Sequence, residues 1–157
     1  MNSPMNLQQE MDYSAIVEAL RSLTAWNFDY NNPAMNGPEL LEQLTDRLLE
    51  LPERQLGVPE LFNIMERLPE AELGTPGPLV YTLEQLDYIE ELIQSVQRVP
   101  TVLSVWMISR LLRSKLHADR RPFFLDLLAG VPRHDRATYA TREDAKHFLR
   151  LYSSKVS

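Results

Sequence analysis

The sequence predicts an all-α protein, and three observations support this prediction. Apolar residues recur at intervals of three and four, the spacing that places them on one face of an α-helix. Prolines and glycines lie between these periodic segments rather than within them. No stretch alternates polar and apolar residues over a useful length, as a half-buried β-strand would. We therefore expect helices joined by loops and no sheet.

The first helix is expected at about residues 12–24, on the apolar stripe Tyr13, Ile16, Leu20 and Leu23. A loop from Asn27 to Gly37 follows. It carries aromatic residues without helical spacing, Phe28 and Tyr30, and Trp26 lies beside it. Such aromatics either cap the first helix or reach a ligand, and the sequence leaves both interpretations open.

Prolines mark the starts of the next helices, at intervals of 19 to 22 residues: Pro38, Pro59, Pro78, Pro100 and Pro122. Proline is favoured in the first helical turn because its fixed φ suits the helix and its missing N–H has no partner there. A Thr-x-x-Asp signal at residues 141–144 predicts a sixth start. The helix at residues 101–114 is apolar on nearly all sides, so we expect it in the middle of the packing, with Trp106 and Met107 in the core.

The segment between Pro78 and Gln97 has two interpretations: one long helix, or two short helices with a break near Asp87. We favour the break. Helices with joints about every 20 residues form pairs of about 40 residues, the period of HEAT and armadillo repeats. The predicted architecture is therefore an array of antiparallel helix pairs, and a compact orthogonal helical bundle is the alternative.

The chain of 157 residues has the size of one domain, and no linker is long or polar enough to separate two. We expect a single helical domain over residues 1–157, with residues 1–10 disordered. No run of about 18 apolar residues could cross a bilayer. The N-terminus lacks the cationic and apolar stretches of a secretory signal, and the absence of cysteine fits a reducing compartment. A cytoplasmic location is expected.

Motifs for catalysis and for metal or cofactor binding are absent from the sequence. No two of His117, His134 and His147 have the i, i+4 spacing of a helical metal site. No glycine-rich phosphate loop and no Gly-x-Ser-x-Gly elbow occurs. We therefore expect no metal, no cofactor and no enzymatic activity. An enzyme whose carboxylates and histidines converge only in three dimensions would leave no linear trace and stays as an alternative class.

Charge is divided unevenly along the chain. Residues 1–98 carry 17 acidic and five basic side chains, a net charge of −12, whereas residues 99–157 carry five acidic and 11 basic ones, a net charge of +6. Spacings of three and four predict that Glu84, Asp87, Tyr88 and Glu91 lie close together on one helix face. Tyrosine is a frequent interface anchor, and clustered carboxylates steer a cationic partner. An acidic pI near 5.1 disfavours a nucleic-acid partner.

The segment from Gly74 to Tyr81, together with Ser95, Arg98, residues 100–101 and residues 104–110, resembles small helical bacterial immunity proteins of polymorphic and contact-dependent toxin systems. The resemblance covers about residues 39–152. It implies a cytoplasmic protein that binds the toxic C-terminal domain of a secreted effector, commonly a nuclease, and blocks its active site or substrate groove. A nuclease is basic where it holds phosphate, so an acidic ridge would suit its surface.

These observations give a hypothesis for the partner and for the site. The partner is a basic toxin domain, bound as a 1:1 heterodimer, with no nucleic-acid or membrane partner. The residues expected to contact the toxin are Tyr81, Glu84, Asp87, Tyr88, Glu90, Glu91, Glu50 and Glu53. The alternative is a HEAT-like adaptor or scaffold that binds a cellular protein or peptide.

Overall fold

A computed structural model describes residues 12–153 of the chain. Within this range the regular structure comprises eight α-helices and four short 3-10 helices, with no strand, which confirms the all-α prediction. The residues divide into two compact units, 1–88 and 89–157. Whether the units form a single domain stays a prediction. The expected disorder of residues 1–10 lies outside the described residues.

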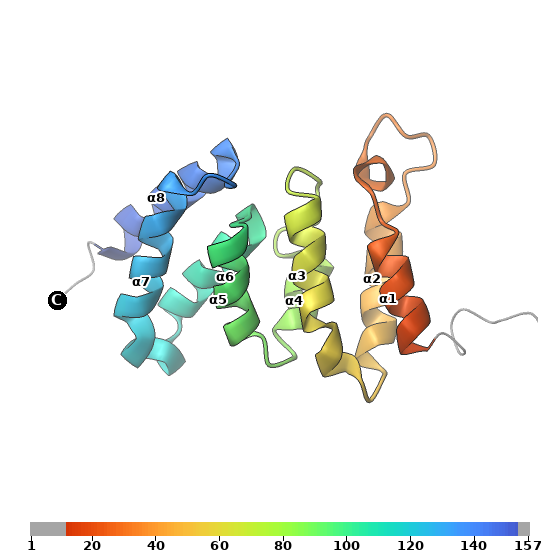
Figure 1. Ribbon diagram of the computed structural model, residues 1–157, viewed down its shortest axis with the longest axis horizontal. Helices are drawn as coiled ribbons and strands as arrows, with labels where there is room; N and C mark the ends of the chain where they lie inside the picture. The colour runs from red at the N-terminus through yellow and green to blue at the C-terminus, as the bar shows by residue number, and fades with distance from the viewer. Residues whose placement is uncertain (1–11, 154–157) are drawn as a thin grey trace, which may run out of the picture. The chain divides into compact units, whose positions relative to one another are not determined.

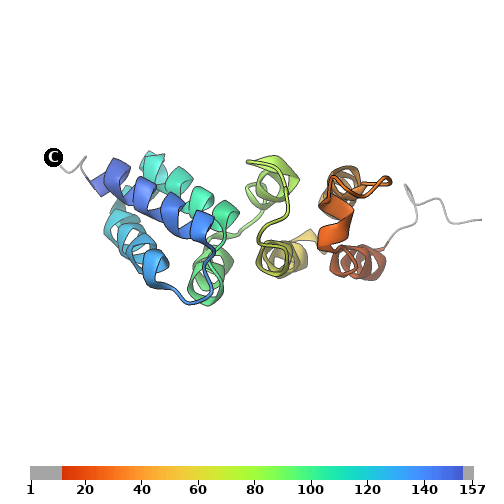
Figure 2. The same cartoon turned by 90° about the horizontal axis from the view of Figure 1, so that it is seen from above.

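Unit 1 contains four α-helices in two layers. They are α1 (Tyr13–Arg21), α2 (Gly37–Leu49), α3 (Val58–Arg67) and α4 (Gly77–Leu83), with the 3-10 helices η1 (Ala25–Phe28) and η2 (Arg54–Gly57) in the connections. Helix α1 packs against α2 and α3, and α4 packs against α2 and α3. Seen from above, α1 and α3 form one layer of this unit and α2 and α4 the other (Figure 2).

The predicted helix starts in unit 1 are confirmed. Pro38, Pro59 and Pro78 lie in the first turns of α2, α3 and α4. The Asp12 carboxylate caps α1 by accepting a hydrogen bond from the Ala15 amide at 2.9 Å. Helix α4 ends at Leu83 and the next helix starts at Ile89, so the predicted break near Asp87 is also confirmed.

Two glycines of unit 1 permit close packing between its elements. Gly37 starts α2 directly under η1, where an added Cβ would stand 2.6 Å from the Asn27 carbonyl oxygen. Gly57 lies against Leu48, with the nearest side-chain carbon 2.8 Å from the position of a Cβ. The core formed between the layers includes fully buried side chains from each helix: Ile16, Leu41, Leu48, Leu61, Phe62, Ile64, Leu79, Val80 and Leu83.

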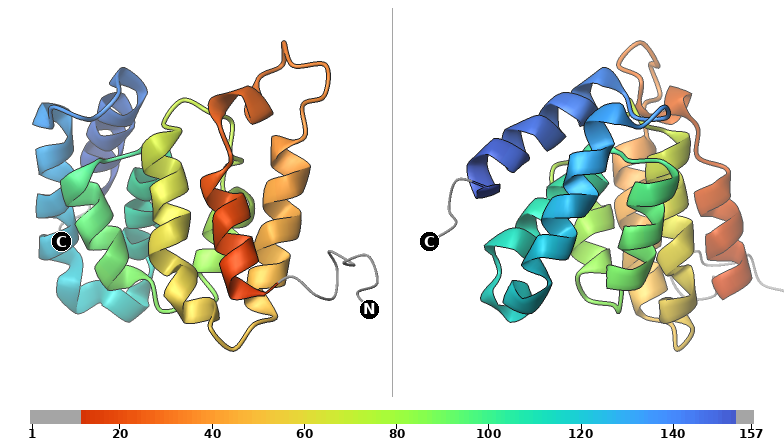
Figure 3. Two further views of the ribbon diagram at one scale, coloured as in Figure 1. Left: turned by 45° about the vertical axis from the view of Figure 1, so that its right-hand side comes forward. Right: turned by 60° about the vertical axis from the view of Figure 1, so that its left-hand side comes forward.

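Unit 2 contains α5 (Ile89–Arg98), α6 (Val102–Arg113), α7 (Arg121–Gly130) and α8 (Tyr139–Ser153), with η3 (Lys115–Arg120) and η4 (Val131–Arg133) between them. Helix α6, which we expected in the middle of the packing, contacts α5, α7 and α8 within unit 2. Helices α7 and α8 lie side by side (Figure 3, right). Across the described residues, no helix has the length and apolar character needed to cross a membrane.

Two expectations for unit 2 need correction. Helix α8 starts at Tyr139 rather than near Thr141, because the Thr138 hydroxyl accepts the Thr141 amide at 3.2 Å and Thr141 is buried inside the helix. Met107 is in the core, as predicted, but Trp106 is only half-buried. The Arg110 guanidinium lies 5.1 Å from the centre of its ring.

Candidate functional site

The residues predicted to contact a partner are divided between the two units. Glu50, Glu53, Tyr81, Glu84, Asp87 and Tyr88 belong to unit 1, whereas Glu90 and Glu91 belong to α5 of unit 2. Because α4 ends at Leu83, residues 84–88 form a connection rather than a helical turn. The expectation that Glu84, Asp87 and Glu91 share one helix face is therefore wrong.

One side chain joins two acidic segments of unit 1. The Gln55 amide group donates from Nε2 to the Asp87 carbonyl oxygen at 2.6 Å, and its Oε1 accepts from the Asp87 amide at 3.0 Å. The two hydrogen bonds satisfy both backbone groups of Asp87 and fix η2 beside the end of the α4 connection. Both segments lie at the lower end of unit 1 in Figure 1, where α2 ends and α3 begins.

We call this region the acidic end and define it by Glu50, Glu53, Leu56 and Asp87. Each of these residues is exposed, and Leu56 is 64% exposed. The Glu50 carboxylate lies 3.1 Å from Nη1 of Arg47, which partly neutralises its charge. The acidic end therefore combines carboxylates with an unburied leucine.

Tyr13, the first residue of α1, has a raised pKa. Burial raises the pKa of the Tyr13 phenol, the Glu60 carboxylate raises it further, Arg21 opposes this change, and Glu53 adds a smaller increase. The phenol therefore stays protonated in the neutral pH range and can act as a hydrogen-bond donor. Burial is the largest cause of this increase, and Glu53 makes the smallest of the four contributions.

The other predicted residues of unit 1 differ in exposure. Tyr81 is 58% exposed, so its ring is available at the surface of α4. Glu84 and Tyr88 are half-buried and make further interactions. Tyr81 is therefore the aromatic residue of this set that is best placed to anchor a partner.

In unit 2, Glu90 and Glu91 have different surroundings. The Glu90 side chain is exposed, and its carboxylate lies 3.5 Å from Nη1 of Arg120. Glu91 is half-buried, and its Oε2 atom is buried without a hydrogen-bond partner among the described residues. A buried carboxylate oxygen presents less charge to a partner than an exposed one does, so Glu91 is the weaker candidate.

Sequence reasoning missed Leu56 as a part of the acidic end, and it missed Gln55 as the residue that holds Asp87 beside η2. Leu56 falls outside the apolar stripes of the helices on either side, and this is the sequence signal that it faces solvent. Gln55 gives no such signal, because its partner Asp87 lies 32 residues further along the chain.

The histidines do not form a metal site in the part of the chain that the structure describes. No group of three or more His, Asp and Glu side chains there could hold a metal ion. The His134 ring bridges two backbone groups instead, with Nε2 2.8 Å from the Gln97 carbonyl oxygen and Nδ1 accepting from the Arg136 amide.

Comparisons of the chain with protein-family models, with curated proteins and with solved structures found no match. The functional argument therefore depends on the residues and on their geometry.

Proposed function

We propose that this chain is an immunity protein that binds a cognate toxin domain, a nuclease, and neutralises it by covering the active site or the substrate groove. The observation that supports this proposal best is the pair of hydrogen bonds between the Gln55 side chain and the Asp87 backbone. They hold the connection that carries the exposed Asp87 beside η2, where Leu56 is exposed and the exposed Glu53 comes directly before η2.

Electrostatics favours a basic protein partner for this surface. Residues 1–88 carry 15 acidic side chains and four arginines, a net charge of −11. A nuclease is positively charged where it holds phosphate, so its surface and the negatively charged surface of unit 1 attract each other, which raises the association rate. Rapid association matters for an immunity protein, because the toxin must be bound before it cleaves nucleic acid.

The composition of the acidic end also fits a protein interface. Interfaces place apolar or aromatic anchors at the centre and polar groups at the rim. Leu56 supplies an exposed anchor, and Glu50, Glu53 and Asp87 supply charges that pair with Lys or Arg of the partner. Tyr81, exposed on α4, is a second candidate anchor outside the acidic end. In this proposal the protein acts in the cytoplasm as one half of a 1:1 heterodimer, without a cofactor and without catalysis.

Co-expression tests the proposal. The protein is expressed with the C-terminal domain of the protein encoded immediately upstream, and both growth and co-purification are measured. We expect growth rescue and a stable complex. Growth arrest despite soluble expression of both chains, with no complex recovered, would overturn the immunity function.

A matched pair of variants tests the position of the binding surface. Glu53→Gln with Asp87→Asn removes two charges from the acidic end and leaves the backbone of Asp87 bonded to Gln55. Glu18→Gln with Glu42→Gln removes two exposed charges from the middle of α1 and α2. We expect weaker toxin binding for the first variant only. Equal affinity of the two variants would show that the toxin binds elsewhere.

The two-layer packing of α1–α4 favours the adaptor as the second candidate, because paired antiparallel helices are the unit of HEAT-like repeats. An adaptor would bind a cellular protein and would not rescue growth in the co-expression test. The same experiment therefore separates the two functions.

A further inference from the structure

A second surface of unit 1 has the composition of a binding groove. It lies between η1 with the loop that follows it and the connection from α3 to α4, and its volume is about 380 Å³. Phe28 and Leu68 supply apolar lining, Tyr30 stands at its edge, and three carboxylates lie around it: Asp29, Glu70 and Glu72. Both connections lie at the upper end of unit 1, opposite the acidic end (Figure 1; Figure 3, left).

Hydrogen bonds hold the loop on one side of this groove in place. The Asn32 side chain donates to the Trp26 carbonyl oxygen at 2.8 Å, and the Asp29 carboxylate accepts from the Asn31 amide at 2.9 Å. Asn27 donates to the side chain of Asn36 at 3.1 Å. These contacts fix the backbone on both sides of Tyr30, yet its side chain is 82% exposed. An aromatic ring on an ordered loop, turned to solvent beside a groove, is available for stacking.

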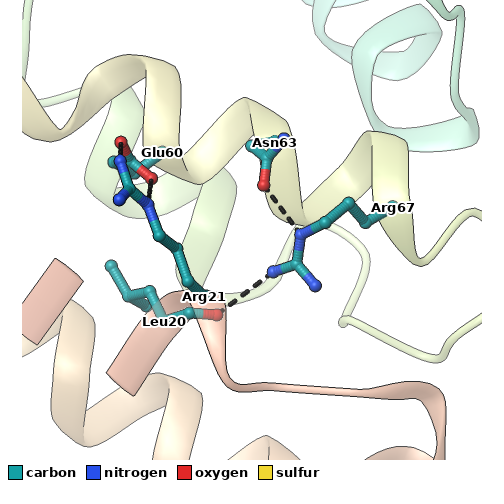
Figure 4. A network of polar contacts seen from close by, with 5 residues as sticks. All are labelled: Leu20, Arg21, Glu60, Asn63 and Arg67. Carbon is teal, nitrogen blue, oxygen red and sulfur yellow. Dashed lines mark hydrogen bonds and ion pairs between the residues drawn. The ribbon is translucent and has the colours of Figure 1, made fainter. Parts of the chain in front are cut away.

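Among residues 12–88, no arginine forms an ion pair with a carboxylate of the groove. Residues 1–88 contain no lysine and four arginines. Arg21 donates to both carboxylate oxygens of Glu60, at 2.9 and 2.7 Å (Figure 4). Arg47 pairs with Glu50.

The other two arginines bind the backbone. Arg54 donates to the Leu49 carbonyl oxygen at 3.2 Å. Arg67 donates to the carbonyl oxygens of Leu20 and Leu23 and to the Asn63 side chain; its bonds to Leu20 and Asn63 are drawn in Figure 4. Within residues 12–88, every arginine is thus engaged elsewhere, and none forms an ion pair with Asp29, Glu70 or Glu72.

From this arrangement we propose that the groove binds an arginine side chain of a partner polypeptide. Three carboxylates that pair with no arginine of residues 12–88 attract a cation, and an exposed tyrosine ring beside them favours a planar one. A guanidinium can stack on Tyr30 and donate paired hydrogen bonds to a carboxylate, which an ammonium group cannot do. The volume is at the low end of the range of small-ligand pockets, about 300–1,000 Å³, and suits one side chain.

This inference does not require the toxin to be the partner, since the groove and the acidic end are separate surfaces of unit 1. An arginine-bearing segment of any protein would fit it. A surface that attracts cations by charge alone would bind lysine and arginine equally well. A preference for arginine would therefore show that stacking and paired hydrogen bonds contribute to binding.

The test uses the ¹⁵N-labelled full chain and an acetylated, amidated Gly-Arg-Arg-Gly peptide, followed by NMR chemical-shift titration. We expect the largest shifts at residues 28–30 and 68–72, and about threefold weaker binding of the matched Gly-Lys-Lys-Gly peptide. Tyr30→Ala removes the stacking surface and weakens binding two- to fivefold, the effect of about 0.5–1 kcal/mol at an exposed site.

Charge variants complete the test. Glu70→Gln with Glu72→Gln should weaken binding about fivefold, since each exposed ion pair contributes up to about 1 kcal/mol. Glu18→Gln with Glu42→Gln, an equal loss of charge, should change the affinity by less than twofold. The inference is wrong if both charge variants weaken binding equally, if lysine and arginine peptides bind alike, or if the shifts lie at residues 50–57 and 84–88.

Discussion

Replacing Gly37 with alanine tests the packing of η1 on α2, on which the position of the groove depends. The added Cβ would stand 2.6 Å from the Asn27 carbonyl oxygen and 2.8 Å from two ring carbons of Phe28. Because one of these neighbours is backbone, η1 must shift. Overpacking of this kind costs about 1–3 kcal/mol, and the helical preference of alanine returns about 0.5–1 kcal/mol. We expect a net loss of about 1–2 kcal/mol from the free energy of unfolding.

Gly130→Ala is the matched control. Gly130 ends α7, has helical backbone angles of φ −79° and ψ −20°, and has no heavy atom within 4 Å of an added Cβ. Alanine fits there without strain and reduces the entropy of the unfolded chain. We expect this substitution to stabilise the protein by about 0.4–1 kcal/mol.

Urea denaturation followed by tryptophan fluorescence measures both effects. The chain has two tryptophans, Trp26 in unit 1 and Trp106 in unit 2, so Trp106→Phe and Trp26→Phe backgrounds report each unit separately. With a slope of about 1–3 kcal/mol per M urea, Gly37→Ala should lower the midpoint reported by Trp26 by roughly 0.5–1 M. An unchanged or higher Trp26 midpoint would refute the close approach of η1 and α2.

Two further predictions concern single polar groups. Arg67→Met keeps most of the apolar stem but removes the hydrogen bonds to the end of α1. Because charged hydrogen bonds contribute about 1.5–3 kcal/mol and this side chain is partly exposed, the free energy of unfolding of unit 1 should fall by about 1–2 kcal/mol. An unchanged urea transition of Trp26 would contradict this prediction. Burial raises the pKa of Asp144, and His147 opposes this, so the folded state favours the protonated carboxyl. The protonated Asp144 carboxyl therefore stabilises the folded state at low pH, and this stabilisation is lost as the pH rises. The free energy of unfolding of Asp144→Asn, relative to that of the parent, should therefore increase from pH 3 to pH 7. It is measured by urea denaturation with Trp106 as the probe. A decrease relative to the parent over this interval would contradict the prediction.

The helix starts were predictable because their signals are local. Proline in the first turn and a polar cap act within three or four residues, so Pro38, Pro59 and Pro78 mark the starts of α2, α3 and α4. The sequence signal at Thr141 does not mark the start of α8, because two threonines that can cap a helix lie three residues apart, at 138 and 141. Thr138 is the residue whose hydroxyl accepts a backbone amide at this helix start, and Thr141 is buried one turn later.

The candidate site was less predictable, because it depends on contacts between distant segments. The charge of residues 84–91 is plain in the sequence, but its arrangement is not. The break after Leu83 separates Glu84 from Glu91, and the Gln55 side chain brings Asp87 to η2. No pattern within one segment encodes a hydrogen bond that spans 32 residues. The burial of Glu91 Oε2 is a tertiary effect of the same kind.

For the groove carboxylates too, one part of the site can be predicted from the sequence and the other part cannot. Composition alone shows that residues 1–88 hold an excess of acidic side chains over arginines. Only the structure shows that Arg21, Arg47, Arg54 and Arg67 are all engaged away from Asp29, Glu70 and Glu72.

The central claim is that the acidic end draws in a basic toxin domain. The most direct test measures the rate constant for association of the purified protein with the toxin domain encoded upstream, at increasing salt concentrations. Three proteins are compared: the parent, the acidic-end variant Glu53→Gln/Asp87→Asn and the control Glu18→Gln/Glu42→Gln. Screening of opposite charges should slow association of the parent steeply as salt increases, with a smaller slope for the acidic-end variant and an unchanged slope for the control. A rate constant that does not depend on salt, or equal slopes for the two variants, would contradict the claim.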